Sequence, residues 1–203
     1  MKSALKLEKS FCADIYWKGK DQTLYKVAAT MNNETVFKNN DGWLFAGKDN
    51  YTKRLSNGMV WDRYLVELSF WFGCYVFEDG RHLYRIAAFT RHLEQPDARN
   101  HRFNGHHVDI SKNSFLGLYD VHPDYIHADR YLNKLLFQLD NMGTDVLRIG
   151  QVVEHVQLTS PNGRQVNVVD DEGYPLLNES GAGTAGSFTL KVLEAGQKFP
   201  FSG

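Results

Sequence analysis

The stretch YLVELSFWFGCYVF-EDGR-HLYRIAAFTRH, residues 64–92, decides the fold. Its first arm, residues 64–77, is dense in aromatic and β-branched residues, which favour strands. Glu78-Asp79-Gly80-Arg81 is a tight-turn sequence, and residues 82–92 return with similar strand character. The pattern therefore predicts an antiparallel hairpin. Gly73, in the middle of the first arm, predicts a bulge or a barrel corner.

Short runs with strand character recur on both sides of this hairpin, with turn signals such as Asn40-Asp41-Gly42 and Ser160-Pro161-Asn162-Gly163 between them. Many short strands at a spacing of about 8–12 residues are typical of a β-sandwich or barrel. We therefore expect one mainly-β, antiparallel domain over residues 1–203. The runs are residues 10–17, 23–31, 34–38, 43–47, 106–110, 114–121, 145–158, 164–169 and 187–194.

One segment carries a helical pattern. Leu132, Leu135, Leu136 and Leu139 follow the i, i+3, i+4, i+7 spacing that places side chains on one helix face. Asp124 supplies a capping residue, and the Asn141-Met142-Gly143 sequence supplies a stop. The sequence predicts one main helix from about residue 124 to residue 141.

Composition excludes several classes of protein. The chain has 203 residues, of which 42% are hydrophobic, so it has enough apolar side chains to build a core. Its formal net charge of -1 argues against a general nucleic-acid binder. No apolar run is long enough to span a membrane, and the N-terminal residues lack a secretory signal. We expect a cytoplasmic protein whose two cysteines, Cys12 and Cys74, are buried and reduced.

Three features of the sequence are candidates for catalysis or ligand binding. Seven of the eight histidines fall between His82 and His127, and His106, His107, Asp109, His122 and His127 resemble a metal-ligand set. We favour solvated or structural histidines over a metal site.

Six basic residues against three acidic ones between Arg81 and Lys112 indicate either an anion site or a solvated basic loop. Residues 181–186, GAGTAG, fit the GxGxxG pattern, but no βαβ unit follows, so a flexible glycine-rich loop is predicted.

Taken in order, the segments of the chain resemble those of the poxin family, viral and insect nucleases that include the baculovirus p26 proteins and degrade 2′,3′-cGAMP. The resemblance covers about residues 7–193 and lies in the order and character of the segments. They are Ser10-Phe11-Cys12-Ala13-Asp14-Ile15-Tyr16, Asp41-Gly42-Trp43-Leu44-Phe45-Ala46-Gly47, Phe72-Gly73-Cys74-Tyr75-Val76-Phe77, Ile86-Ala87-Ala88-Phe89-Thr90-Arg91, Asn104-Gly105-His106-His107-Val108, Asn113-Ser114-Phe115-Leu116-Gly117, Asp124-Tyr125, Arg148-Ile149-Gly150 and Pro161-Asn162-Gly163-Arg164.

The resemblance implies a chymotrypsin-protease-like β-barrel fold, a homodimer, and cleavage of one phosphodiester without metal or cofactor. The ribose 2′-hydroxyl attacks in line, helped by a His, a Tyr and a Lys. Here Tyr125 matches the family's Tyr, but Asp129 stands in the place of the Lys and no His precedes His82.

The residues that the resemblance nominates for catalysis are therefore Tyr125, with His127 or His122 beside it and Arg130 as the phosphate cation. On this reading the protein acts in the host cytosol and takes a cyclic dinucleotide, with no membrane or bulk nucleic-acid partner. The alternative is a non-catalytic viral interaction or structural protein of the same fold that works as a dimer.

Overall fold

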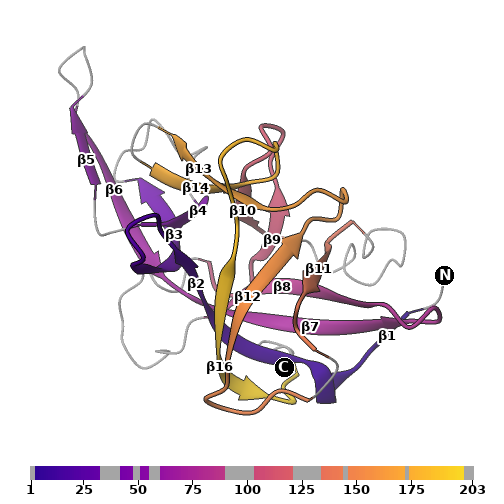
Figure 1. The fold of residues 1–203 in the computed structure, drawn as a ribbon. Coiled ribbons are helices and arrows are strands. Elements are labelled where there is room, and N and C mark those ends of the chain that lie inside the picture. The colour runs from indigo at the N-terminus through magenta and orange to yellow at the C-terminus, as the bar shows by residue number, and fades with distance from the viewer. Residues whose placement is uncertain are drawn as a thin grey trace.

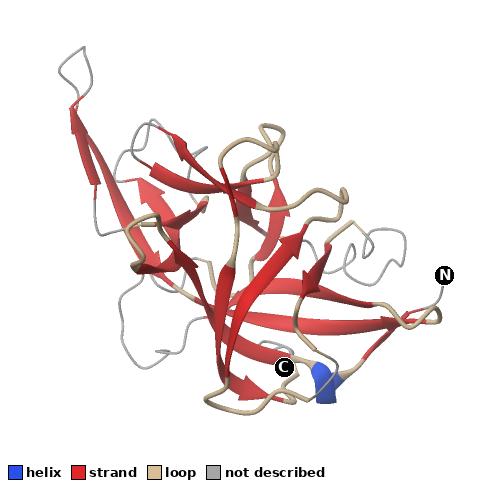
Figure 2. Ribbon diagram, viewed as in Figure 1, coloured by secondary structure: helices blue, strands red, loops and turns tan. Residues whose placement is uncertain are grey.

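The computed structural model describes residues 3–32, 42–47, 51–54, 60–89, 103–120, 134–143, 146–171 and 174–198. Within these residues the chain is almost entirely antiparallel β-structure, as expected (Figures 1 and 2). The one helical element among them is a 3-10 turn, η1 (Leu7–Lys9), and none of their helices is long and apolar enough to cross a membrane. The strands are β1 (Ser3–Leu5), β2 (Phe11–Lys18), β3 (Leu24–Asn32), β4 (Leu44–Ala46), β5 (Tyr51–Arg54), β6 (Val60–Glu67), β7 (Ser69–Phe77), β8 (His82–Phe89), β9 (His107–Ile110), β10 (Leu116–Tyr119), β11 (Leu136–Asp140), β12 (Val152–Thr159), β13 (Asn167–Asp171), β14 (Tyr174–Asn178), β15 (Thr184–Ala185) and β16 (Phe188–Ala195).

The predicted central hairpin is confirmed as β7 and β8. The two strands pair from Ser69 opposite Phe89 to Val76 opposite His82, without a break in register. Gly73 pairs with Arg85 in that ladder, so the predicted bulge at Gly73 is wrong. The glycine is needed for another reason: a Cβ there would lie 2.1 Å from Cη2 of Trp71, whose ring occupies the space.

Six strands pair into a closed ring in the order β7, β8, β11, β12, β16 and β2, with β2 returning to β7. In Figure 1, β7 and β8 run side by side across the lower half of the molecule, and β12 and β16 run side by side in a direction that crosses them. Because side chains alternate between the two faces of a strand, every second residue points into the ring. The buried residues that share the interior include Phe11, Ile15, Phe70, Phe72, Ile86, Phe137, Val156, Phe188 and Leu190.

A second set of strands extends from the ring at β3. This strand pairs with β2, β4 and β6, and the sheet continues from β4 through β14 and β13 to β15. β5 pairs with β6, and the β9–β10 hairpin joins at β8. Apolar residues of this part, such as Val27, Leu44 and Leu177, belong to the same buried cluster as the ring interior. The ring and the second set of strands therefore share one main core.

The predicted helix over residues 124–141 is wrong where the structure describes it, because residues 136–140 form β11. The leucine spacing also contains a period of two, since Phe137 and Leu139 enter the core while Gln138 is exposed. Phe137 is fully buried, and it pairs with β8, which a helix at this position cannot do. Residues 124–133, the N-terminal part of the predicted helix, lie outside the described residues.

The glycine-rich segment 181–186 contains a short strand, which the prediction of a flexible loop missed. Thr184 and Ala185 form β15 and pair with Val168 and Asn167 of β13. A Cβ at Gly183 would lie 2.4 Å from the carbonyl oxygen of Val168, so this close approach requires glycine. The GxGxxG pattern therefore reflects packing against β13, at the edge of the sheet.

Both cysteines are buried and neither forms a disulfide bond, as expected. Cys74 lies inside the ring, where burial raises the pKa of its thiol. Cys12 lies on the opposite face of the sheet, against Trp71 and Ala87. A buried thiol with a raised pKa is a poor nucleophile, which fits a packing role.

Candidate functional site

The residues nominated from the sequence, Tyr125, His127, His122 and Arg130, fall within residues 121–133 and lie outside the described residues. Chemistry-bearing side chains also gather elsewhere in the described structure, and three of these places bear on ligand binding and on the stability of the fold. Two of them lie on opposite faces of the β2–β3 hairpin. The third lies where β8 meets β9.

The register of β2 and β3 separates the first two places. Trp17 pairs with Tyr25, and Tyr16 pairs with Lys26. Since neighbouring residues of a strand point to opposite faces, Trp17 and Tyr25 share one face of the hairpin while Tyr16 and Lys26 share the other. Trp17 belongs to the core cluster and Tyr25 packs against it, so theirs is the inner face.

A cleft of about 790 Å³ opens on the inner face, between the β2–β3 turn and strands β4, β13 and β15. This volume is within the range of small-molecule sites, about 300–1,000 Å³. The rings of Trp17 and Tyr25 stack with centroids 6.2 Å apart and an interplanar angle of 28°. The residues that line the cleft are Trp17, Gly19, Lys20, Asp21, Tyr25, Phe45, Ala46, Gly47, Val168, Val169, Pro175, Gly183 and Thr184.

The charged groups of the cleft come from the β2–β3 turn. Asp21 Oδ2 accepts a hydrogen bond of 2.5 Å from the Tyr25 hydroxyl, and Asp21 Oδ1 accepts one of 3.1 Å from the backbone N–H of Thr23. Lys20 is exposed beside this pair. The turn therefore brings a carboxylate, a phenol and an ammonium to an aromatic cleft. From the sequence the Lys18-Gly19-Lys20-Asp21 segment is a turn and nothing more.

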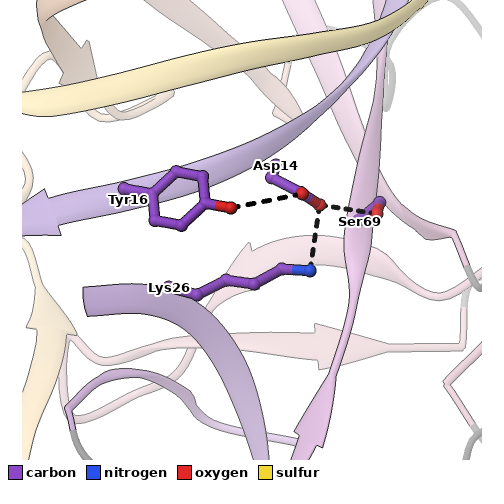
Figure 3. A network of polar contacts seen from close by, with 4 residues as sticks. All are labelled: Asp14, Tyr16, Lys26 and Ser69. Carbon is purple, nitrogen blue, oxygen red and sulfur yellow. Dashed lines mark hydrogen bonds and ion pairs between the residues drawn. The ribbon is translucent and has the colours of Figure 1, made fainter. Parts of the chain in front are cut away.

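The outer face of the same hairpin carries a polar network around Asp14 (Figure 3). The Ser69 hydroxyl donates to Asp14 Oδ1 over 2.7 Å, and Lys26 Nζ lies 3.1 Å from the same oxygen. The Tyr16 hydroxyl donates to Asp14 Oδ2 over 3.4 Å. The network links β2, β3 and β7 through one carboxylate that is 9% exposed.

The electrostatics of this network indicate a structural role. The pKa of Tyr16 is raised, mainly by burial and then by the charge of Asp14 and its hydrogen bond. Tyr16 therefore stays a neutral donor at physiological pH. Asp14 already accepts from three donors, which satisfies a buried carboxylate. Neither residue offers a ready base or nucleophile, so the network fixes the hairpin to β7.

The third place is a buried pair between β8 and β9. Arg85 is 5% exposed and His107 is 2% exposed, and the guanidinium contacts both ring nitrogens of His107, with Nε 3.1 Å from Nδ1. Burial, then the charge of Arg85, lowers the pKa of His107 to about 3. His107 is thus a neutral structural imidazole. Among the described residues, no three His, Cys, Asp or Glu side chains gather as metal ligands.

The His107 pair predicts acid sensitivity of the fold. An unfolded histidine titrates near a pKa of about 6.5, whereas folded His107 titrates at about 3. The unfolded state then binds more protons, so stability is lost as the pH falls from about 6.5 toward 3. Urea denaturation of wild type and His107→Gln at a series of pH values measures this. The variant should lose a large part of the slope across that window; an unchanged slope contradicts the assignment.

Asp109 affects stability in the opposite direction from His107 as the pH falls, so the same titration must take it into account. Burial, and less strongly the charge of Glu179, raises the pKa of Asp109. A raised carboxyl pKa means that the folded state binds the proton more tightly, so this group favours folding as the pH falls. Comparing wild type with His107→Gln cancels the contribution of Asp109, because both proteins contain it.

No protein-family model, curated protein or solved structure matches the chain. The function is therefore argued from the residues and their geometry. The cleft is the described feature that best fits a ligand, because it combines apolar walls with a few polar groups at one end.

Proposed function

We propose that this chain is a poxin-like, metal-independent phosphodiesterase that binds a cyclic dinucleotide in the cleft beside the β2–β3 turn. The observation that carries the proposal is the composition of that cleft, with aromatic walls and Lys20, Asp21 and Tyr25 at one end. The closed six-stranded ring with a second sheet is compatible with the protease-like barrels that the resemblance implies.

The cleft binds the dinucleotide by stacking against its bases and by charge attraction to its phosphate. Bases stack on aromatic side chains for about 1–3 kcal/mol each, and the Trp17–Tyr25 stack with Phe45 offers such a surface. A phosphate of the ligand pairs with Lys20, as ammonium groups bind phosphates by charge. A cyclic dinucleotide presents both features together, two planar bases and two phosphodiesters.

Cleavage uses the carboxylate and the phenol at the turn. The ribose 2′-oxygen forms a bond to phosphorus as its proton passes to Asp21, and the bond from phosphorus to the leaving ribose oxygen breaks. The Tyr25 hydroxyl gives its proton to the leaving oxygen and regains one from Asp21 through the hydrogen bond between them, which restores both groups. Lys20 offsets the charge that develops on the phosphate. These are the base, phenol and cation roles that the family resemblance assigns to His, Tyr and Lys.

This assignment competes with the set nominated from the sequence, Tyr125 with His127 or His122 and Arg130. Both sets serve the same reaction, so single substitutions separate them. Loss of cleavage in Asp21→Asn supports the turn, and loss in Tyr125→Phe supports the other set. The dimer stays a prediction under either assignment.

Incubation with 2′,3′-cGAMP in EDTA tests binding and cleavage together. We expect a rise in the melting temperature and a linear product on chromatography. Lys20→Ala should weaken binding about 10-fold, since bonds to charged groups contribute about 1.5–3 kcal/mol. Asp21→Asn should bind but cleave at least about 100-fold more slowly, the usual contribution of a general base. Lys112→Ala, an exposed turn lysine away from the cleft, is the matched control.

Two outcomes contradict parts of this proposal. No thermal shift and no product from the wild type rejects the dinucleotide function. Binding that depends on Lys20 without any product rejects cleavage and supports the second candidate, a non-catalytic interaction protein. The observation that favours this second candidate is that both carboxylate oxygens of Asp21 already accept hydrogen bonds.

A further inference from the structure

A second constellation lies on the outer face of the sheet, across the hairpin from the cleft. Phe188 of β16 pairs with Trp17 of β2, and both belong to the core. Ser187, the preceding residue, therefore lies on the outer face, opposite the position of Lys18 at the end of β2. In Figure 1, β12 and β16 run alongside one another, and β16 also pairs with β2.

Ser187 lies beside a histidine of the neighbouring strand. Its hydroxyl oxygen is 3.4 Å from Nδ1 of His155, and His155 is exposed. With the ring proton on Nε2, Nδ1 accepts the hydroxyl hydrogen. A serine hydroxyl next to an imidazole acceptor is the basic arrangement of nucleophilic catalysis, and its distance is commonly longer before substrate binds.

The backbone directs His155 to this position. The register of β12 against β16 shifts between Val153 and Val156, so the strand has a bulge that contains His155. His155 has a φ of 60°, in the left-handed region, which costs about 1–2 kcal/mol for a residue with a Cβ. The Nδ2 of Asn141 donates to the carbonyl oxygen of His155 over 3.0 Å and holds it there. Bulges and strained residues of this kind re-aim side chains at functional sites.

The glycine-rich segment positions Ser187 from the other side. The backbone N–H of Gly186 donates to the carbonyl oxygen of Val166 over 3.2 Å. A Cβ at Gly186 would lie 2.4 Å from that oxygen, so only glycine lets the chain approach so closely before Ser187. The segment that matched GxGxxG thus positions a serine on the outer face, instead of forming a phosphate-binding turn before a helix.

The next strands add a cation and an apolar contact. Lys18 is exposed, and it pairs with Leu24, whose side chain is 51% exposed. We call these four residues the outer row: His155 of β12, Ser187 immediately before β16, Lys18 of β2 and Leu24 of β3. A nearby ammonium favours the oxyanion of an acyl-transfer intermediate, and an exposed leucine offers a surface for an acyl chain.

We propose that the outer row is an acyl-transfer site, in which Ser187 is the nucleophile and His155 its base, with carboxylic esters as the substrate class. It stands apart from the proposed dinucleotide function, because the cleft is on the inner face of the β2–β3 hairpin and shares none of these four residues.

The reaction proceeds in two balanced steps. The Ser187 oxygen bonds to the carbonyl carbon as its proton passes to His155 Nδ1; the carbon–oxygen bond to the leaving alcohol then breaks, and His155 returns the proton to that alcohol. Water attacks the acyl-serine with His155 as base, the ester bond to Ser187 breaks, and the carboxylic acid leaves while Ser187 regains its proton.

The test uses the full chain with p-nitrophenyl acetate and a fluorophosphonate probe, followed by mass spectrometry of the modified peptide. We expect wild type to release p-nitrophenol in a burst and to carry the phosphonate on Ser187. Ser187→Ala should lose both signals. His155→Asn should slow acylation at least about 100-fold, as for loss of a general base, because asparagine accepts the left-handed backbone but provides no base.

The control is Ser180→Ala, an exposed serine of the same glycine-rich region. It should acylate like wild type, and all three variants should keep the wild-type melting temperature within a few degrees. Label on lysines alone, or equal labelling of wild type and Ser187→Ala, overturns the proposal. So does an unchanged rate in His155→Asn.

Discussion

Gly73→Ala is expected to destabilise the fold by about 3 kcal/mol, the upper part of the range for overpacking a core. The added Cβ would lie 2.1 Å from Cη2 of Trp71 and 2.6 Å from its Cζ3, far inside van der Waals contact. The indole cannot easily move, since Trp71 is 1% exposed and its Nε1 donates to the carbonyl oxygen of Gln197 over 3.1 Å. Either β7 or the indole must shift, and the ring closure between β2 and β7 weakens.

A double-mutant cycle with Trp71→Leu isolates the cause. Urea denaturation should show that Gly73→Ala costs much less when the indole is already gone, since the clash is the interaction that couples the two sites. Trp71→Leu alone has its own cost from lost packing. Additive effects of the two changes contradict the close contact that we describe.

Asp14→Ala is the second large effect, with an expected loss of about 2 kcal/mol, because the buried carboxylate accepts charge-assisted and neutral hydrogen bonds that are all lost together. Lys26 and the hydroxyl of Ser69 both lose their acceptor on Asp14 Oδ1. These contacts join β2 to β3 and to β7, so the change loosens the hairpin that carries the cleft. Urea denaturation followed by fluorescence measures the loss.

Two variants show whether the charge pair is responsible. Tyr16→Phe removes only the hydrogen bond of 3.4 Å to Asp14 and should cost less than about 1 kcal/mol. The double variant Asp14→Leu, Lys26→Met removes both charges and should recover part of the stability, since apolar side chains in place of a partly buried pair avoid the cost of desolvating the charges. The network model fails if Asp14→Ala behaves like Tyr16→Phe.

Local signals were enough to predict most strands. The Glu-Asp-Gly-Arg turn joins β7 and β8 as expected, but the first arm begins at Ser69 rather than at residue 64, because residues 64–67 belong to β6. The turn at residues 160–163 likewise separates β12 from the strand that follows. Ring closure could not be predicted from such local signals, because pairings such as β2 with β7 join residues about sixty positions apart.

The prediction of a helix was wrong for a physical reason. A leucine pattern is compatible with periods of 3.6 and of 2 when the intervening residue, here Phe137, is also apolar. Tertiary pairing with β8 and β12 then decided in favour of β11. The candidate sites likewise could not be predicted from local sequence patterns. Lys20, Asp21 and Tyr25 occupy an ordinary turn, and Ser187 lies thirty-two residues from His155, so neither group forms a sequence motif.

The most direct test of the central claim is a crystal structure of Asp21→Asn soaked with 2′,3′-cGAMP in EDTA. Our account predicts one base against the Trp17–Tyr25 stack and a phosphate oxygen within hydrogen-bond distance of Lys20 Nζ. A dinucleotide seated beside Tyr125, with the cleft between the β2–β3 turn and β13 left empty, would contradict it.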